Sequence, residues 1–334
     1  MIETALHAHL VARGAHHADD HGVALPRHFG DAEAEYRALR ERAAVIDLGF
    51  RTLVLASGAD RVSFFQGMLT NDVARLEPGR NRPALLLTIQ GRVTADVRVA
   101  ELGDALGLDV DVRARDELLA ALDKLLIADD VELAQADVAL IGVEGPGAAD
   151  AVARMPAGTR VLRGGELGAD GVVVHTSSAD APAVWDAIVA AGAQPCGMDA
   201  LEGRRVELVI PRIGLDMDQS TLALEVPVDF ALSQTKGCYL GQEVVARGTA
   251  RGHVNRKLVS MALAGPLPPA GTPLVRDGKE VGRLTTVARA YGAGTGAALG
   301  FVRREHWDLG TELAVRHGHA VTIATIADLA RSSG

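Results

Sequence analysis

Lys236-Gly-Cys-Tyr-Leu-Gly-Gln-Glu243 is the stretch from which the fold and the function of this chain are best approached. Glycines on both sides of Cys238 and Tyr239 allow the backbone to turn sharply or to approach a ligand closely. A short helix is expected over Gln242–Ala246. A thiol just before a helix N-terminus and beside a lysine ammonium lies where the reactive thiolate is favoured. A buried structural cysteine in a glycine-rich bend is the equally weighted alternative.

Hydrophobic periodicity upstream of this stretch predicts two α+β modules. In the first, a strand over Thr52–Ala56 precedes a helix that places Val62, Phe65 and Leu69 on one face. Two strands, Pro83–Thr88 and Val93–Leu102, and a helix opened by Asp116 follow. This order is typical of helices that cover one face of an antiparallel sheet. The second module repeats the pattern with strands at Ala139–Val143 and Gly171–His175 and helices at Pro146–Met155, Ala181–Ala191 (capped by Asp180) and Met198–Leu208.

The last part of the chain changes character after about residue 250. Short apolar runs are separated there by Gly and Pro, and Asp277-Gly278 is a hairpin signal. We therefore expect a small all-β barrel or sandwich. Its predicted strands are Lys257–Leu263, Thr272–Val275, Val281–Arg289, Glu312–Val315 and Ala320–Thr325, and Gly292–Gly296 is interpreted as a loop.

Composition excludes several classes of protein. The formal net charge of −9 argues against nucleic acid as the main partner. The sequence contains no apolar run long enough to span a membrane and no secretory signal, so a soluble cytoplasmic protein is expected. Two cysteines, Cys196 and Cys238, exclude a disulfide scaffold, and Cys196 is predicted to be a small core residue. We find no GxGxxG, GxxxxGK[ST], GxSxG or HExxH motif.

The first thirty residues are rich in histidine. The cluster around His16, His17 and His21 contains ligand types suited to a metal, but its spacing matches no tetrahedral zinc pattern. We expect no metal site and interpret this segment as a solvated N-terminal arm.

Two carboxylates stand in apolar surroundings. Glu207, on an otherwise apolar helix, is suited to accept paired hydrogen bonds from a planar amino-heterocycle such as a pterin. An ion pair with a nearby arginine such as Arg204 is the alternative. Asp96 lies in an apolar strand, where a lone carboxylate needs a partner or an exposed face. Asn71 and Asp72, after the helix that contains Phe65, could simply cap or turn the chain.

Taken together, these segments resemble the YgfZ-type folate-binding proteins, relatives of the T-protein aminomethyltransferase of glycine cleavage. KGCYLGQE is close to the signature Lys-Gly-Cys-aromatic-x-Gly-Gln-Glu of that family. The likeness also includes Ala44–Leu48, Phe65–Asp72, Gly197–Asp218, Leu299–Arg303 and Gly310–Leu313.

The resemblance implies a three-lobed aminomethyltransferase-like fold of class α+β. Two α/β, ferredoxin-like modules and a C-terminal β-barrel would surround a central cavity for tetrahydrofolate. The implied domains are residues 1–50 with 137–245, residues 51–136, and residues 246–334.

The resemblance also implies a function, namely tetrahydrofolate binding in support of iron–sulfur cluster assembly or repair in client enzymes. Cys238 and Asp96 would be the reactive residues, and Glu207 would hold the pterin. The further folate-binding candidates are Phe65, Asn71, Lys236, Tyr239, Gln242 and Arg247. The alternatives are a tetrahydrofolate-dependent aminomethyl or methyl transferase that uses Asp96, and a non-catalytic folate-binding regulator.

Overall fold

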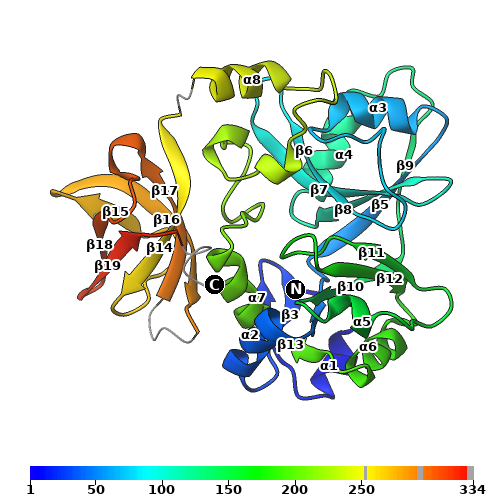
Figure 1. Ribbon diagram of the computed structural model, residues 1–334, viewed down its shortest axis with the longest axis horizontal. Helices are drawn as coiled ribbons and strands as arrows, with labels where there is room; N and C mark the ends of the chain where they lie inside the picture. The colour runs from blue at the N-terminus through cyan, green and yellow to red at the C-terminus, as the bar shows by residue number, and fades with distance from the viewer. Residues whose placement is uncertain (252–253, 292–295, 329–334) are drawn as a thin grey trace. The chain divides into compact units, whose positions relative to one another are not determined.

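The computed structural model describes residues 1–251, 254–291 and 296–328. Their contacts divide the chain into two compact units, each discontinuous in sequence (Figure 1). The first unit holds residues 1–86, 94–201 and 230–240. The second unit holds residues 87–93, 202–229 and 241–334.

The N-terminal segment is folded, and its interpretation as a solvated arm is wrong. Strands β1 (Ile2–Glu3), β3 (Val23–His28) and β2 (His16–Asp20) form a three-stranded sheet in that order. Helix α1 (His7–Val11) lies between β1 and β2 in sequence. Leu6 and Leu10, four residues apart, are both fully buried, as is Leu25 on β3. Burial of these apolar side chains offsets the cost of ordering a segment that is otherwise rich in histidine.

The first of two five-stranded sheets has the strand order β11-β12-β10-β4-β13. Its core contains Trp185 from helix α6 (Ala181–Ala190), which is fully buried. Pro182 stands in the first turn of α6 as predicted, but Asp180 makes no side-chain cap and instead accepts a hydrogen bond from the Ser177 hydroxyl (2.7 Å). The strands are β4 (Ala44–Asp47), β10 (Val138–Glu144), β11 (Arg160–Arg163), β12 (Val172–Ser177) and β13 (Gln194–Cys196), and the other helices nearby in sequence are α2 (Ala32–Glu41), α5 (Ala148–Ala151) and α7 (Met198–Glu207).

A second five-stranded sheet has the order β6-β7-β8-β5-β9. Strand β8 (Leu106–Asp111) is completely buried and was not predicted. Helix α4 begins at Arg115, one residue before the predicted start. The remaining elements are β5 (Arg51–Ser57), α3 (Arg61–Met68), β6 (Arg82–Leu87), β7 (Val93–Glu101), α4 (Arg115–Asp123) and β9 (Glu132–Gln135).

The C-terminal strands close into a six-stranded barrel, in the order β14-β17-β16-β15-β18-β19 (Figure 1). The Asp277-Gly278 hairpin is confirmed, since both residues have positive φ between paired Arg276 and Lys279. Most of the segment interpreted as a loop at 292–296 lies outside the described residues. The strands are β14 (Arg256–Ala264), β15 (Pro273–Arg276), β16 (Lys279–Arg289), β17 (Gly296–Arg303), β18 (Glu312–His317) and β19 (Ala320–Ile326).

The predicted fold class is confirmed as α+β with a closed C-terminal β-barrel. The segment before the barrel contains helix α8 (Gln242–Arg251) and two short 3-10 turns, η1 (Ala223–Glu225) and η2 (Asp229–Ala231), and a third, η3 (Arg304–His306), follows β17. Across the residues that the structure describes, no helix combines the length and the apolar character needed to cross a membrane.

Candidate functional site

Asp96 lies at the centre of a cluster of charged side chains built on β7 and β8. In this antiparallel pair Arg98 lies directly opposite Asp109. Asp96 is two residues from Arg98 along β7 and therefore lies on the same face of the sheet. The register thus brings two carboxylates and a guanidinium together on one face of the sheet.

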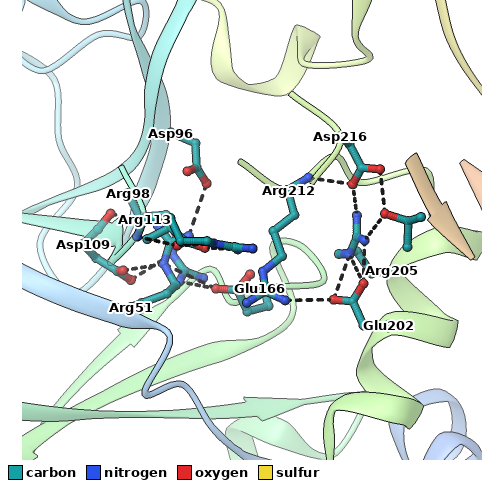
Figure 2. A network of polar contacts seen from close by, with 12 residues as sticks. Arg51, Asp96, Arg98, Asp109, Arg113, Glu166, Glu202, Arg205, Arg212 and Asp216 are labelled. Carbon is teal, nitrogen blue, oxygen red and sulfur yellow. Dashed lines mark hydrogen bonds and ion pairs between the residues drawn. The ribbon is translucent and has the colours of Figure 1, made fainter. Parts of the chain in front are cut away.

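Arg51, the first residue of β5, joins the two carboxylates of this cluster (Figure 2). Its Nε donates to Oδ1 of Asp109 (2.5 Å) and its Nη2 donates to the Asp109 carbonyl (2.9 Å). The remaining nitrogen, Nη1, donates to Oδ2 of Asp96 (3.2 Å). Because the Arg51 side chain is only 3% exposed, these contacts fix the guanidinium in one position.

One oxygen of the Asp96 carboxylate has no hydrogen-bond partner. The side chain as a whole is 25% exposed, but this oxygen, Oδ1, is itself buried. Burial raises the pKa of the Asp96 carboxyl above its usual value, and the charge of Arg51 opposes this effect. A carboxylate anchored through one oxygen and unpartnered at the other is arranged to accept a proton or a hydrogen bond from a ligand amine.

Asp109 has the opposite electrostatic character. Burial alone would raise the pKa of its carboxyl, but Arg51 and Arg98 hold that pKa below its usual value. The ion pair between Arg98 Nε and Asp109 Oδ2 spans 2.9 Å. Asp109 is therefore the ionised anchor of the cluster.

Glu166 completes the cluster from a loop between β11 and β12. Its carboxylate pairs with Arg98 and lies 3.5 Å from Nε of Arg51. Glu144 stabilises the loop, because its Oε1 accepts a hydrogen bond from the Glu166 backbone N–H (2.6 Å). Glu144 is 1% exposed, and burial raises the pKa of its carboxyl to about 8.

Glycines on either side of Glu166 make room for the Glu144 carboxylate. A Cβ at Gly165 or at Gly171 would lie 2.1 Å from one of the Glu144 carboxylate oxygens. Any larger residue at these positions would have to displace either the carboxylate or the loop. The loop geometry that presents Glu166 to Arg51 therefore depends on both glycines.

The segment Lys236–Glu243, called the signature segment below, is attached to the end of α3 by Lys236. Its ammonium donates to the backbone carbonyls of Gln66 (2.6 Å), Leu69 and Asn71 (3.0 Å). Burial lowers the pKa of this lysine to about 8. The ammonium also lies 5.3 Å from the centre of the Tyr239 ring. Lys236 and Tyr239, which is 8% exposed, therefore have structural contacts within the protein. Their roles toward a folate stay predictions.

Cys238 is exposed, and the preceding Gly237 has a φ of 95° that few other residues adopt. The alternative of a buried structural cysteine at this position is therefore wrong. Cys196 is the buried thiol, as predicted. It is 1% exposed and donates to the Glu35 carbonyl (3.2 Å), and burial raises the pKa of its thiol.

The side chains of two predicted folate-binding residues, Phe65 and Asn71, make contacts within the protein. Phe65 has no exposed surface and packs edge to face on Phe64, with 5.2 Å between ring centres. It therefore belongs to the core and offers no ring face to a ligand. Asn71 donates from Nδ2 to the carbonyls of Pro83 (2.8 Å) and Phe230 (3.3 Å), while its Oδ1 accepts the Asp72 N–H. Its amide thus shapes a turn, which was the simpler of the two interpretations.

The other predicted residues lie in the second unit. Glu207 forms an ion pair with Arg204 (Nη1–Oε2 2.6 Å), which was its alternative interpretation, and its side chain is 14% exposed. Arg247 pairs with Glu243 on the exposed side of α8, and Gln242 is the half-buried first residue of that helix. Their roles toward a folate stay predictions.

A separate buried cluster within the second unit links α7 to the barrel (Figure 2). Arg205 donates to Asp216 (2.6 Å) and to the Thr286 hydroxyl on β16 (3.0 Å). Asp216 in turn accepts hydrogen bonds from the hydroxyls of Thr285 and Thr286. We interpret this cluster as structural, since its charges are matched and buried.

Within the described residues, no group of three or more His, Cys, Asp or Glu side chains is placed to hold a metal ion. The N-terminal histidines instead contact one another in pairs. The rings of His7 and His17 are 4.4 Å apart, and those of His16 and His28 are 4.6 Å apart.

Sequence reasoning identified Asp96 but missed its partner Arg51 and the other members of the cluster, Asp109 and Glu166. The available signal was a set of charges within apolar strands, namely Arg98 on β7 and Asp109 and Asp111 on β8. Which of these pair with one another depends on the strand register, and the sequence pattern did not reveal β8.

Comparison with known proteins agrees with this architecture. The GCVT N-terminal domain matches residues 6–159, and the glycine cleavage T-protein C-terminal barrel domain matches residues 256–330. An aminomethyltransferase of Bacillus subtilis is 29% identical over 322 residues, which covers 88% of this chain and 89% of the relative. One from Geobacillus kaustophilus is 28% identical over 321 residues, 88% of each chain.

A solved structure gives the same fold at low sequence identity. It is the glycine cleavage system aminomethyltransferase T from Bartonella henselae, with a TM-score of 0.87 and 18% identity. The match covers 98% of this chain and 97% of that one.

Proposed function

Because this chain carries both the N-terminal and the barrel domains of the glycine-cleavage T-protein family, we propose that it is a tetrahydrofolate-dependent transferase of one-carbon units. The one-carbon unit would come from an amine donor, as in aminomethyl or methyl transfer. The observation that supports this proposal most directly is the geometry of Asp96. Arg51 holds its Oδ2 at 3.2 Å, and its Oδ1 has no partner.

The Asp96 carboxylate is suited to this cofactor as a hydrogen-bond acceptor. Reduced folates present amine nitrogens, and an amine N–H needs an acceptor that is already in position. Asp96 would accept that hydrogen bond through Oδ1 and stabilise the positive charge that develops as the amine is alkylated. Arg51 would prevent the carboxylate from rotating away. Tetrahydrofolate would supply the nitrogen that receives the one-carbon unit.

The test is turnover with tetrahydrofolate and an aminomethyl or N-methyl donor. We expect Asp96→Asn to lower kcat by about 100-fold or more, which is the usual effect of losing a positioned acid–base group. Tetrahydrofolate binding, measured by titration calorimetry, should change little. Asp104→Asn is the matched control because Asp104 is exposed on the loop between β7 and β8.

The outcome for Asp96→Asn decides between the possible roles. If Asp96→Asn turns over at the wild-type rate, Asp96 has no role in the reaction. Tight tetrahydrofolate binding by the wild type, without turnover on any amine donor, would instead favour a non-catalytic folate-binding regulator.

A second function, iron–sulfur cluster assembly or repair in client proteins, has its own supporting observation. Cys238 is exposed on a segment that Lys236 fastens to α3, so its thiol is accessible to a client. In cells lacking the gene, an iron–sulfur enzyme should lose activity, and Cys238→Ala should fail to restore it. Cys196→Ala, which alters the buried thiol, is the control. Equal rescue by both variants would exclude this role for Cys238.

Glu207 is proposed as a pterin-binding carboxylate in either function. If it has this role, Glu207→Gln should weaken tetrahydrofolate binding more than Glu243→Gln, since Glu243 lies on the exposed side of α8. Equal affinities would rule out the pterin-binding role of Glu207, whose ion pair with Arg204 would then be structural.

A further inference from the structure

A cleft of about 440 Å³ opens in the first unit, beside the N-terminal segment. This volume lies within the roughly 300–1,000 Å³ typical of small-molecule sites. Apolar side chains such as Leu6 and Val112 line part of it. The polar lining that the argument uses comes from Thr4, Asp47, Arg51, Arg113, Arg115 and Gln135.

Arg113, one of the lining residues, has an unsatisfied donor. Its Nε and Nη2 bind the two oxygens of Asp111, with 2.8 Å between Nε and Oδ1. Its Nη1 is buried and has no hydrogen-bond partner. A buried donor without an acceptor costs about 1–3 kcal/mol, so a ligand that supplies an acceptor there would recover this free energy.

The adjacent Arg115 adds a second guanidinium at the start of α4. Its Nε pairs with the exposed carboxylate of Asp116 (2.8 Å), and its own side chain is 31% exposed. Ala114, at the N-cap of this nine-residue helix, offers no side-chain cap. The positive end of the helix dipole therefore reinforces the two guanidinium groups.

The lining also contains two carboxylates, those of Asp47 and Glu3. Both oxygens of the Asp47 carboxylate are hydrogen-bonded, one to the Thr4 hydroxyl (2.6 Å) and the other to the Gly49 N–H (2.9 Å). Burial also raises the pKa of its carboxyl to about 6. Glu3 is 71% exposed, so water screens its charge.

We propose that this cleft binds a small organic anion, whose carboxylate or phosphate group accepts hydrogen bonds from Arg113 Nη1 and Arg115. Guanidinium groups are suited to both kinds of anion. The apolar lining would cover the carbon skeleton of the ligand. Arg51 also lines the cleft, so the ligand would lie against the residue that holds Asp96.

The experiment is titration calorimetry of the full chain with three probes, namely glutarate, glycerol phosphate and inorganic phosphate. We expect saturable binding of glutarate or of glycerol phosphate, and the better of the two identifies the head group. Arg113→Lys keeps a positive charge beside Asp111 but removes the planar fork, and should weaken binding about tenfold or more. Arg37→Gln, an exposed arginine on α2, should leave affinity unchanged.

Arg115→Gln keeps the test decisive if Arg113→Lys disturbs the fold, because the side-chain hydrogen bonds of Arg115 within the described residues go to exposed Asp116 and to Gln135. The proposal is overturned if the wild type shows no saturation with either organic probe up to about 10 mM. Binding that both variants leave intact, or binding of inorganic phosphate alone, would overturn it equally. Asp96 does not line the cleft, so Asp96→Asn should bind the anion normally even if it abolishes turnover.

Discussion

Arg51 Nη1 donates to Asp96 Oδ2 across 3.2 Å, while the other two nitrogens of the same guanidinium are held by Asp109. The two carboxylates bound to Arg51 therefore have different roles. Asp109, 1% exposed in its side chain, fixes the arginine. Asp96, whose side chain is 25% exposed, has a buried oxygen, Oδ1, without a hydrogen-bond partner. Asp96, the proposed reactive residue, is thus positioned by a buried ion pair between Arg51 and Asp109.

Removing Arg51 should destabilise the protein strongly. Arg51→Met would leave the buried Asp109 with Arg98 as its remaining cationic partner. Breaking one side of a buried ion pair typically costs about 3–5 kcal/mol. The measurement is urea unfolding at neutral pH, with Arg283→Met, an exposed barrel arginine paired with Glu280, as the control. A loss no larger than that of the control would show that Asp109 does not depend on Arg51.

Stability should fall between about pH 5 and pH 8 because of Glu144. Its folded-state pKa of about 8 lies above the value of 4.5 that it has when unfolded. Over this window the native state holds a proton that the unfolded state has released, so rising pH favours unfolding. Below the lower pKa both states are protonated, and this penalty is absent.

Glu144→Gln removes this proton equilibrium and keeps an amide oxygen that can accept the Glu166 N–H. The expected result is a flatter dependence of the unfolding free energy on pH than in the wild type, measured by urea titrations from pH 5 to above 8. The control is Glu117→Gln on the exposed side of α4. Parallel pH curves for the wild type and Glu144→Gln would contradict the raised pKa.

The two thiols should differ sharply in reactivity. In the native protein a thiol reagent should modify Cys238 rapidly, whereas Cys196 should react only when the structure opens. We expect a difference in rate of about 100-fold or more, followed by mass spectrometry of the labelled peptides. Cys238→Ser should abolish the fast phase and Cys196→Ser should preserve it. A single fast phase of two thiols would show that Cys196 is accessible.

The fold class was predictable because most strands alternate or run apolar between Gly and Pro, and because the barrel strands follow turn signals. Nine strands, β1 to β4, β8, β9, β11, β13 and β17, were not predicted, and two of them were missed for definable reasons. Strand β8 contains buried Asp109 and Asp111, which interrupt the apolar pattern, and β17 is built largely of Ala and Gly. With β8 missing, the register that pairs Arg98 with Asp109 could not be inferred.

The site shows the same limit of sequence reasoning. Asp96 and Cys238 stood out as single residues, in an unusual strand and in an unusual motif. The partner of Asp96 lies 45 positions away in sequence, and Lys236 reaches carbonyls 165 to 170 positions away. Such contacts exist only after the chain has folded. Phe65 illustrates the reverse error, since an aromatic at helical spacing proved to be core.

Lys236 should be required for the order of the signature segment. Lys236→Met removes the ammonium that binds three carbonyls at the end of α3 and leaves those carbonyls without their donor. We expect a stability loss of about 1–3 kcal/mol, the usual cost of unsatisfied buried polar groups. Amide hydrogen exchange should also quicken at Leu240, whose N–H donates to the Gly67 carbonyl (3.0 Å). Lys257→Met, an exposed residue of β14, is the control. If exchange at Leu240 is unchanged in Lys236→Met, the segment is held by its other contacts, and the lysine is free to serve a ligand.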